Sequence, residues 1–125
     1  MLFDTDVLIW FLRGNEKAAT FLAKERDRTL SQVSWMELVQ GAKDKRELAV
    51  MRAFLARMDF RLLPLTENIG HRAMLYVEQH ALKGGVKMAD ALVAATAVEY
   101  GQPIGTANVK RYRPLAGVQL APFGP

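Results

Sequence analysis

Apolar residues recur at helical spacing in several segments of the chain and form short uninterrupted runs in others. The segment 44–58 shows the helical spacing most clearly, because its apolar residues share one side of a helix and its basic residues the other. These patterns predict helices at 5–12, 16–26, 32–42, 44–58, 66–82 and 88–100, and strands at 1–3, 28–31, 59–63, 103–106 and 118–120. The helix at 32–42 is expected to bury Val33, Met36, Leu38 and Val39. Strands that alternate with helices indicate an α/β protein with a mostly parallel central sheet and helices on both faces.

The first apolar stretch, Leu2 to Leu12, is interrupted by two carboxylates, Asp4 and Asp6. The simplest interpretation is a buried strand at 1–3 with Asp4 at its exposed end, followed by a helix that Thr5 or Asp6 caps. An acid where a strand ends and a helix begins lies where open α/β sheets place their ligand crevice. The alternative is that Asp4 is only a turn residue and Asp6 only a helix cap.

Composition narrows the class of protein. The chain has 125 residues, which suits one domain spanning 1–125. Cysteine is absent, which excludes disulfides and thiolate metal sites and fits a reducing compartment. The apolar runs are short and contain acids, so we expect a cytoplasmic protein with no membrane partner. The net charge of +4 permits binding to nucleic acid or to an acidic partner.

Three acids share one unusual setting. Asp4, Glu37 and Asp90 are each flanked by apolar residues near the predicted start of a helix. In a parallel sheet those helix starts lie along one edge, and carboxylates gathered there repel one another unless a cation joins them. Oxygen ligands without histidine or thiolate suit Mg²⁺ or Mn²⁺, which can activate a water and stabilise a reacting phosphate. The alternative is three separate caps and turns.

Four motifs occur in order along nearly the whole chain. They are Asp4-Thr5-Asp6-Val7-Leu8-Ile9, Glu37-Leu38 with Gly41 four residues after the acid, Asp90-Ala91-Leu92-Val93-Ala94-Ala95-Thr96-Ala97, and Thr106-Ala107-Asn108. In these motifs the sequence resembles PIN-domain ribonucleases, and more narrowly the VapC-type toxins of toxin–antitoxin pairs. The resemblance implies a PIN-like three-layer α/β sandwich, a divalent-metal site, an RNA substrate, a small VapB-like antitoxin and a homodimer.

The resemblance also implies roles for individual residues. Asp4, Glu37 and Asp90 match the three acidic positions and are the expected metal ligands. With Asn108 they form the expected catalytic set, and the expected supporting or substrate-contacting residues are Asp6, Thr106 and Arg111. The sequence departs from the family at Arg111, where many members carry an aspartate. Its guanidinium is expected near the acids, where it either competes with Mg²⁺ or, as we favour, grips the substrate phosphate.

The function implied is a Mg²⁺-dependent endoribonuclease, the toxin of a type II toxin–antitoxin pair. Its antitoxin is expected to cover an apolar rim near Trp10 and Trp35. Two alternatives use the same residues. One is a catalytically weak PIN domain that binds RNA or antitoxin without efficient cleavage, and the other is a metal-dependent nuclease that acts on DNA.

Overall fold

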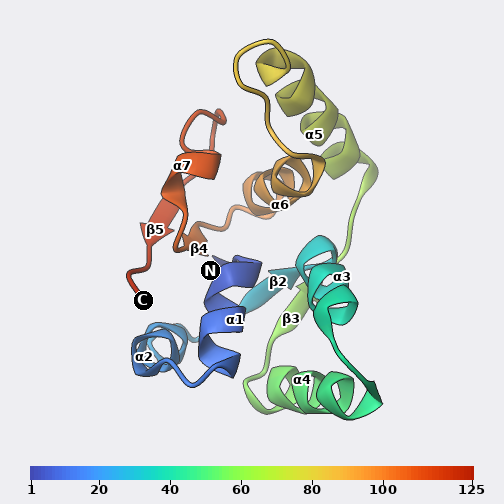
Figure 1. The fold of residues 1–125 in the computed structure, drawn as a ribbon. Helices are drawn as coiled ribbons and strands as arrows, with labels where there is room; N and C mark the ends of the chain where they lie inside the picture. Colours follow the sequence, from blue (N-terminus) through green and yellow to red (C-terminus); the bar gives the residue numbers. More distant parts are fainter.

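The computed structural model describes residues 1–125, and at its centre is a five-stranded sheet in which all neighbouring strands are parallel. The strands lie in the order β3-β2-β1-β4-β5 (Figure 1). Their bounds are β1 Leu2–Phe3, β2 Thr29–Ser31, β3 Arg61–Leu63, β4 Ile104–Thr106 and β5 Leu120–Pro122. The predicted α/β class is confirmed, and the sheet is parallel throughout.

Helices cover both faces of the sheet. Their bounds are α1 Thr5–Leu12, α2 Glu16–Ala23, α3 Gln32–Gly41, α4 Lys45–Arg57, α5 Glu67–His80, α6 Met88–Glu99 and α7 Val109–Tyr112. Neighbouring residues of a strand point to opposite faces, and β1 shows the consequence. Leu2 packs into a core with α5 and α6, whereas Phe3 packs into a second core with α1, α2 and α4. The result is the three-layer arrangement that the sequence predicts. None of these helices combines the length and the apolar character needed to cross a membrane.

Successive strands are added on one side of β1 and then on the other, so the order of the strands reverses there. The chain moves from β1 outward to β2 and β3, then returns through α5 and α6 to β4 on the other side of β1. At such a reversal the C-terminal ends of the two central strands border a crevice that binds ligands in open α/β sheets. β1 leads directly into Asp4, whose amide donates to the carbonyl of Gly105 at 2.9 Å, and β4 ends at Thr106. The fold therefore places the first and last motifs of the sequence side by side.

The start of α1 differs from the prediction. Asp4, not Thr5 or Asp6, is the N-cap, and its side chain accepts the amide of Thr5. Asp4 is also buried, at 3% exposure, whereas an exposed strand end was expected. The reason is that two side chains cover the end of β1 and contact the carboxylate: Thr106, the last residue of β4, and Arg111, which follows β4.

Other differences concern short segments. Met36 is 50% exposed, not buried, because the buried stripe of α3 runs through Ser34 and Leu38 and Met36 lies two residues from each, on the opposite side. The helix α7 was not predicted, since four residues are too few to show a helical repeat. α2 ends at Ala23 instead of 26, and the last strand lies at 120–122 instead of 118–120.

Gly105 in β4 is closely covered by neighbouring side chains. A Cβ there would lie 2.8 Å from the ring of Phe21 and 2.9 Å from the sulfur of Met1. We expect Gly105→Ala to lose on the order of 1–3 kcal/mol of unfolding free energy through overpacking. Gly70→Ala is the control, because that helical glycine has nothing within 4 Å, and it should gain about 0.4–1 kcal/mol. Urea denaturation measures both, and an unchanged midpoint for Gly105→Ala would contradict the close packing.

Candidate active site at the edge of the sheet

Asp4 is held from both sides. One carboxylate oxygen accepts the amide of Thr5 at 2.9 Å, and the other accepts the hydroxyl of Thr106 at 2.9 Å. Thr106 is itself fully buried at the end of β4. Because a buried carboxylate is costly unless hydrogen bonds or charges compensate it, these contacts allow Asp4 to occupy the crevice in a fixed orientation.

Asp6 joins α1 to the turn that follows β4. Its Oδ2 atom accepts the backbone amide of Ala107 at 3.1 Å. Its Oδ1 atom is buried and has no hydrogen-bond partner. One oxygen of Asp6 therefore holds the turn in place, and the other is buried without a hydrogen bond.

Asp90 reaches the same place from another element, the first turn of α6, and is 8% exposed. Arg111 links it to Asp4 and Asp6 at the start of α1. The Nη2 atom of Arg111 lies 3.5 Å from Asp4 Oδ2 and 3.3 Å from Asp6 Oδ2, and Nη1 lies 3.5 Å from Asp90 Oδ1. Asp4, Asp6 and Asp90, which we call the acid cluster, thus surround one guanidinium.

Burial disfavours the charged form of the carboxylates in the acid cluster. Burial is the largest cause that raises the pKa of Asp6 to about 6, and repulsion from the charge of Asp4 raises it further. Burial likewise raises the pKa of Asp90, against the opposing effect of Arg111. Burial alone would lower the pKa of Arg111, but the surrounding carboxylates raise it on balance, so it stays charged. The site therefore favours a cation among these oxygens.

Tyr112 lies beneath the site and was missed by the sequence reasoning. The residue is fully buried, and its hydroxyl has no hydrogen-bond partner. Burial, and then the charges of Asp4 and Asp90, raise the pKa of this hydroxyl, so it remains a proton donor. The segment that carries it has no apolar repeat, and no pattern in the sequence marked it as interior.

Glu37 and Asn108 lie at the rim. Glu37 is exposed, and its Oε1 atom accepts the hydroxyl of Thr5 at 2.7 Å, although its charge is close enough to raise the pKa of Asp90. Asn108 is exposed, and its backbone amide donates to the hydroxyl of Thr106 at 3.0 Å. Of the residues proposed from sequence, the structure brings together Asp4, Asp6, Asp90, Thr106 and Arg111, and it leaves Glu37 and Asn108 at the edge.

The acid cluster offers only carboxylate oxygens as ligands, which suit a hard divalent cation. One of these oxygens, on Asp6, is buried without a hydrogen-bond partner. The geometry fits less directly. No three acidic or histidine side chains lie close enough together to hold a metal ion as they stand. The cation in contact with the acids is Arg111, so a divalent ion would bind by replacing the guanidinium.

A polar pocket opens beside the acid cluster. It has a volume of about 540 Å³ and lies between the loop at 84–87 and the segment that follows β4. Its charged and amide side chains are Lys87, Asp90, Asn108, Lys110 and Arg111. Three cations against one acid make this pocket suitable for an anion.

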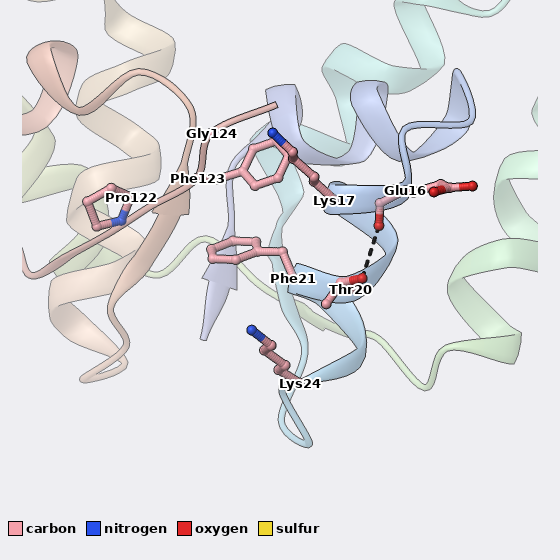
Figure 2. Close-up of a pocket in the computed structure, with 8 residues that line it drawn as sticks. All are labelled: Glu16, Lys17, Thr20, Phe21, Lys24, Pro122, Phe123 and Gly124. Atoms are coloured by element: carbon pink, nitrogen blue, oxygen red, sulfur yellow. Dashed lines mark hydrogen bonds between the residues drawn. The ribbon is translucent and has the colours of Figure 1, made fainter.

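A second cavity, of about 420 Å³, lies between α2 and the C-terminal segment (Figure 2). Phe21 and Phe123 lie next to each other in its wall, with their ring centroids 5.2 Å apart, and Lys17 and Lys24 flank them (Figure 2). No member of the acid cluster lines it. We therefore assign the candidate chemistry to the crevice between β1 and β4.

The fold and the site define a class, a parallel α/β sandwich with a buried carboxylate cluster where the strand order reverses. Within that class the chain belongs to the PIN domain family, whose model matches residues 1–113. The resemblance read from the four motifs is thereby confirmed.

The chain is also similar to individual proteins and solved structures. The chain is 31% identical over 119 residues to Ribonuclease VapC19 of Mycobacterium tuberculosis, covering 89% of this chain and 90% of the relative. It is 33% identical over 113 residues to Ribonuclease VapC10 of the same organism, covering 87% and 83%. Its fold is similar to a chain of a toxin–antitoxin complex from Klebsiella pneumoniae, with a TM-score of 0.81, 27% identity, and coverage of 99% of this chain and 98% of that chain. It is also similar to a chain of VapBC2 from Rickettsia felis bound to a promoter DNA fragment, with a TM-score of 0.85, 16% identity, and coverage of 98% of both.

The raised pKa of Asp6 predicts how stability changes with pH. Between pH 3.8 and about 6 the Asp6 carboxyl stays protonated in the folded protein but ionises in the unfolded chain. The free energy of unfolding of the metal-free protein should therefore fall as pH rises through that window. Asp6→Asn keeps the acceptor for Ala107 and removes the charge, so its advantage over the parent in melting temperature should grow from pH 4 to pH 7. Asp27→Asn is the opposite control, because Arg61 lowers the pKa of Asp27. A pH-independent difference for Asp6→Asn would contradict the assigned burial.

Proposed function

We propose that the protein is a Mg²⁺-dependent endoribonuclease that acts in the cytoplasm as the toxin of a type II toxin–antitoxin pair. The observation that carries this proposal is the buried acid cluster at the strand reversal of a PIN domain. The names of the relatives support it, since both are called ribonucleases and the similar structures come from toxin–antitoxin complexes.

In this proposal Asp4 and Asp90 hold the divalent ion, Mg²⁺ or Mn²⁺, and Glu37 completes its shell or takes the proton that the attacking water loses. When bound, the ion supplies charge stabilisation at the scissile phosphate and makes the water more acidic. Glu37 suits proton removal because it is exposed at the rim and held by Thr5. The water oxygen attacks phosphorus while its proton passes to Glu37. The P–O bond to the leaving ribose oxygen breaks, and that oxygen keeps the bonding electron pair and takes a proton from solvent.

The neighbouring residues position these groups. Thr106 orients Asp4 through a bond of 2.9 Å, and Asp6 fixes the turn that carries Asn108. Lys87 and Lys110 line the polar pocket and would draw in the RNA backbone. The side chain of Asn108 opens into the same pocket and offers a neutral donor to a phosphate oxygen.

The proposal assigns the antitoxin to a groove of about 620 Å³ between α1, α3 and α4. We call it the antitoxin groove, and its apolar residues are Ile9, Leu12, Leu38, Val50 and Met51. Leu12 and Val50 are 38% and 55% exposed, which suits an apolar segment of a small partner. Glu37 lies in the same groove, so an occupant would reach the active site. From the sequence, the antitoxin is expected at an apolar rim near Trp10 and Trp35. Neither residue lines this groove, so the groove is an alternative binding surface.

A homodimer is also part of the proposal. Exposed apolar side chains on α5 and α6, with Met74 at 61% and Met88 at 75%, offer a second face for it. Sedimentation equilibrium of the purified chain tests this directly, since a monomer mass at micromolar concentration would contradict it.

The contacts of Arg111 favour a second candidate function. If the guanidinium stays among the acids, the protein would bind RNA or antitoxin without efficient cleavage. A circular RNA and a DNA circle of the same sequence, each incubated with Mg²⁺ or with a chelator, separate the candidates. We expect linear products from RNA in Mg²⁺ alone. Binding without cleavage would favour the weak enzyme, and equal cutting of DNA would favour a deoxyribonuclease.

A further inference from the structure

The contacts of Arg111 have an unusual geometry. Its two terminal nitrogens lie 3.3–3.5 Å from oxygens of three different carboxylates. A charge-assisted bond between guanidinium and one carboxylate is commonly about 2.7–2.9 Å long and often bidentate. Arg111 is therefore shared among the acid cluster as a central cation, without a close pair to any one member. Its Nε atom is buried and has no partner at all.

A divalent ion held by Asp4 and Asp90 would compete with this guanidinium for the same two carboxylates. Two cations gathered at the same carboxylates would repel each other strongly in a partly buried site. Entry of a metal therefore requires the side chain of Arg111 to leave. This movement is available, because the side chain is 35% exposed and belongs to the short helix α7 on the surface.

The polar pocket gives the departing side chain a destination. Arg111 lines this pocket as well as the acid cluster, and the pocket also carries Lys87 and Lys110. Three cations would repel one another there unless an anion joined them. A phosphate group is the matching ligand, because guanidinium binds it through two parallel bonds.

We propose that Arg111 exchanges partners when a divalent ion binds. In the metal-free protein it occupies the acid cluster in place of the divalent ion, and once metal binds it turns to a backbone phosphate of the nucleic acid in the polar pocket. The proposal rests on the proposed function for its choice of ligand. Arg111 then has two roles, one after the other: it competes with the metal before the metal binds, and it binds phosphate afterwards.

The first test measures metal alone. Mn²⁺ binding is titrated by calorimetry, without nucleic acid, for the parent, Arg111→Gln and Arg113→Gln. Arg113 is a matched control, because it is exposed, carries the same charge and forms no ion pair with the cluster. We expect Arg111→Gln to bind Mn²⁺ roughly tenfold or more tightly than the parent, and Arg113→Gln to differ from the parent much less. Equal affinities for the parent and Arg111→Gln would overturn the proposal.

The second test measures the coupling to phosphate. The affinity for a short single-stranded RNA is measured by fluorescence anisotropy in Ca²⁺, with the RNA verified intact, and again in chelator. In Ca²⁺ we expect Arg111→Gln to weaken RNA binding more than Arg113→Gln does. In chelator the two variants should weaken RNA binding equally, because the parent's Arg111 guanidinium is then held by the acids. If Arg111→Gln lost the same RNA affinity in Ca²⁺ as in chelator, the exchange would be overturned. Arg111→Lys keeps the charge and should retain most of the competition with metal, which guards against a folding defect in the glutamine variant.

Neither test reads cleavage. A protein that shows this exchange but cuts no RNA would refute the proposed nuclease and leave the role of Arg111 intact. A protein that cuts RNA with unchanged metal affinity in Arg111→Gln would do the reverse.

Discussion

Asp90→Asn should lower the rate of RNA cleavage on the order of a thousandfold or more while the protein stays folded. The substitution keeps the size of the side chain and removes one of the charged ligands of the proposed metal, which supplies several kcal/mol of transition-state stabilisation. In metal-free buffer the variant should melt at a higher temperature than the parent, because burial already makes the Asp90 carboxylate costly and raises its pKa. Single-turnover cleavage and thermal unfolding measure the two effects.

The matched control for this change is Asp59→Asn. Asp59 is exposed, and its left-handed backbone, with φ of 53°, is a conformation that asparagine tolerates. Its cleavage rate should equal that of the parent. Cleavage by Asp90→Asn at the parent rate would remove Asp90 from the site, whatever the melting temperatures show.

Expression of the chain alone should arrest growth of a bacterial host, and co-expression of a small antitoxin encoded beside it should restore growth. The physical reason is that an endonuclease with an open polar pocket has access to cellular RNA until a partner covers the site. Colony counts after induction provide the measurement. The Asp90→Asn chain should be harmless, and the Asp59→Asn chain should remain toxic.

The antitoxin groove supplies a sharper version of the same experiment. Val50 is 55% exposed in this groove, so Val50→Lys should fold normally and stay toxic. It should nevertheless escape the antitoxin, because a charged side chain would be buried in the interface without a partner. Normal growth during verified high-level expression of the folded parent would count against the toxin and favour the weak enzyme.

Much of the fold was predictable because local patterns and tertiary packing agree. The segment 44–58 shows one clear apolar side, and the structure has a helix at Lys45–Arg57 that buries Met51 and Phe54. The alternation of strands and helices correctly predicted a parallel sheet. The failures lie where a few residues depend on distant neighbours. Met36 was assigned to the core because it is apolar, and only the packing of α3 shows which side faces inward.

Sequence reasoning anticipated five residues that the structure brings together, Asp4, Asp6, Asp90, Thr106 and Arg111, but less of their arrangement. Apolar flanks correctly marked Asp4 and Asp90 as unusual, and both prove to be buried. The expectation that Arg111 approaches the acids is also confirmed by its contacts. Spacing alone does not reveal that Glu37 is bonded to Thr5 at the rim, because that contact depends on how α3 packs against α1. The burial of Asp4 was missed for the same reason, since residues about a hundred positions away cover it.

In the proposed nuclease, Asp4 and Asp90 together bind a divalent ion for phosphodiester hydrolysis. Anomalous diffraction from crystals soaked in Mn²⁺ tests this binding, because the anomalous peak locates the ion without reference to activity. We predict a peak between the carboxylates of Asp4 and Asp90, with the guanidinium of Arg111 displaced toward Lys87 and Lys110. A structure at saturating Mn²⁺ in which the guanidinium still lies among the acids, with no peak beside Asp4, would contradict metal binding at this site.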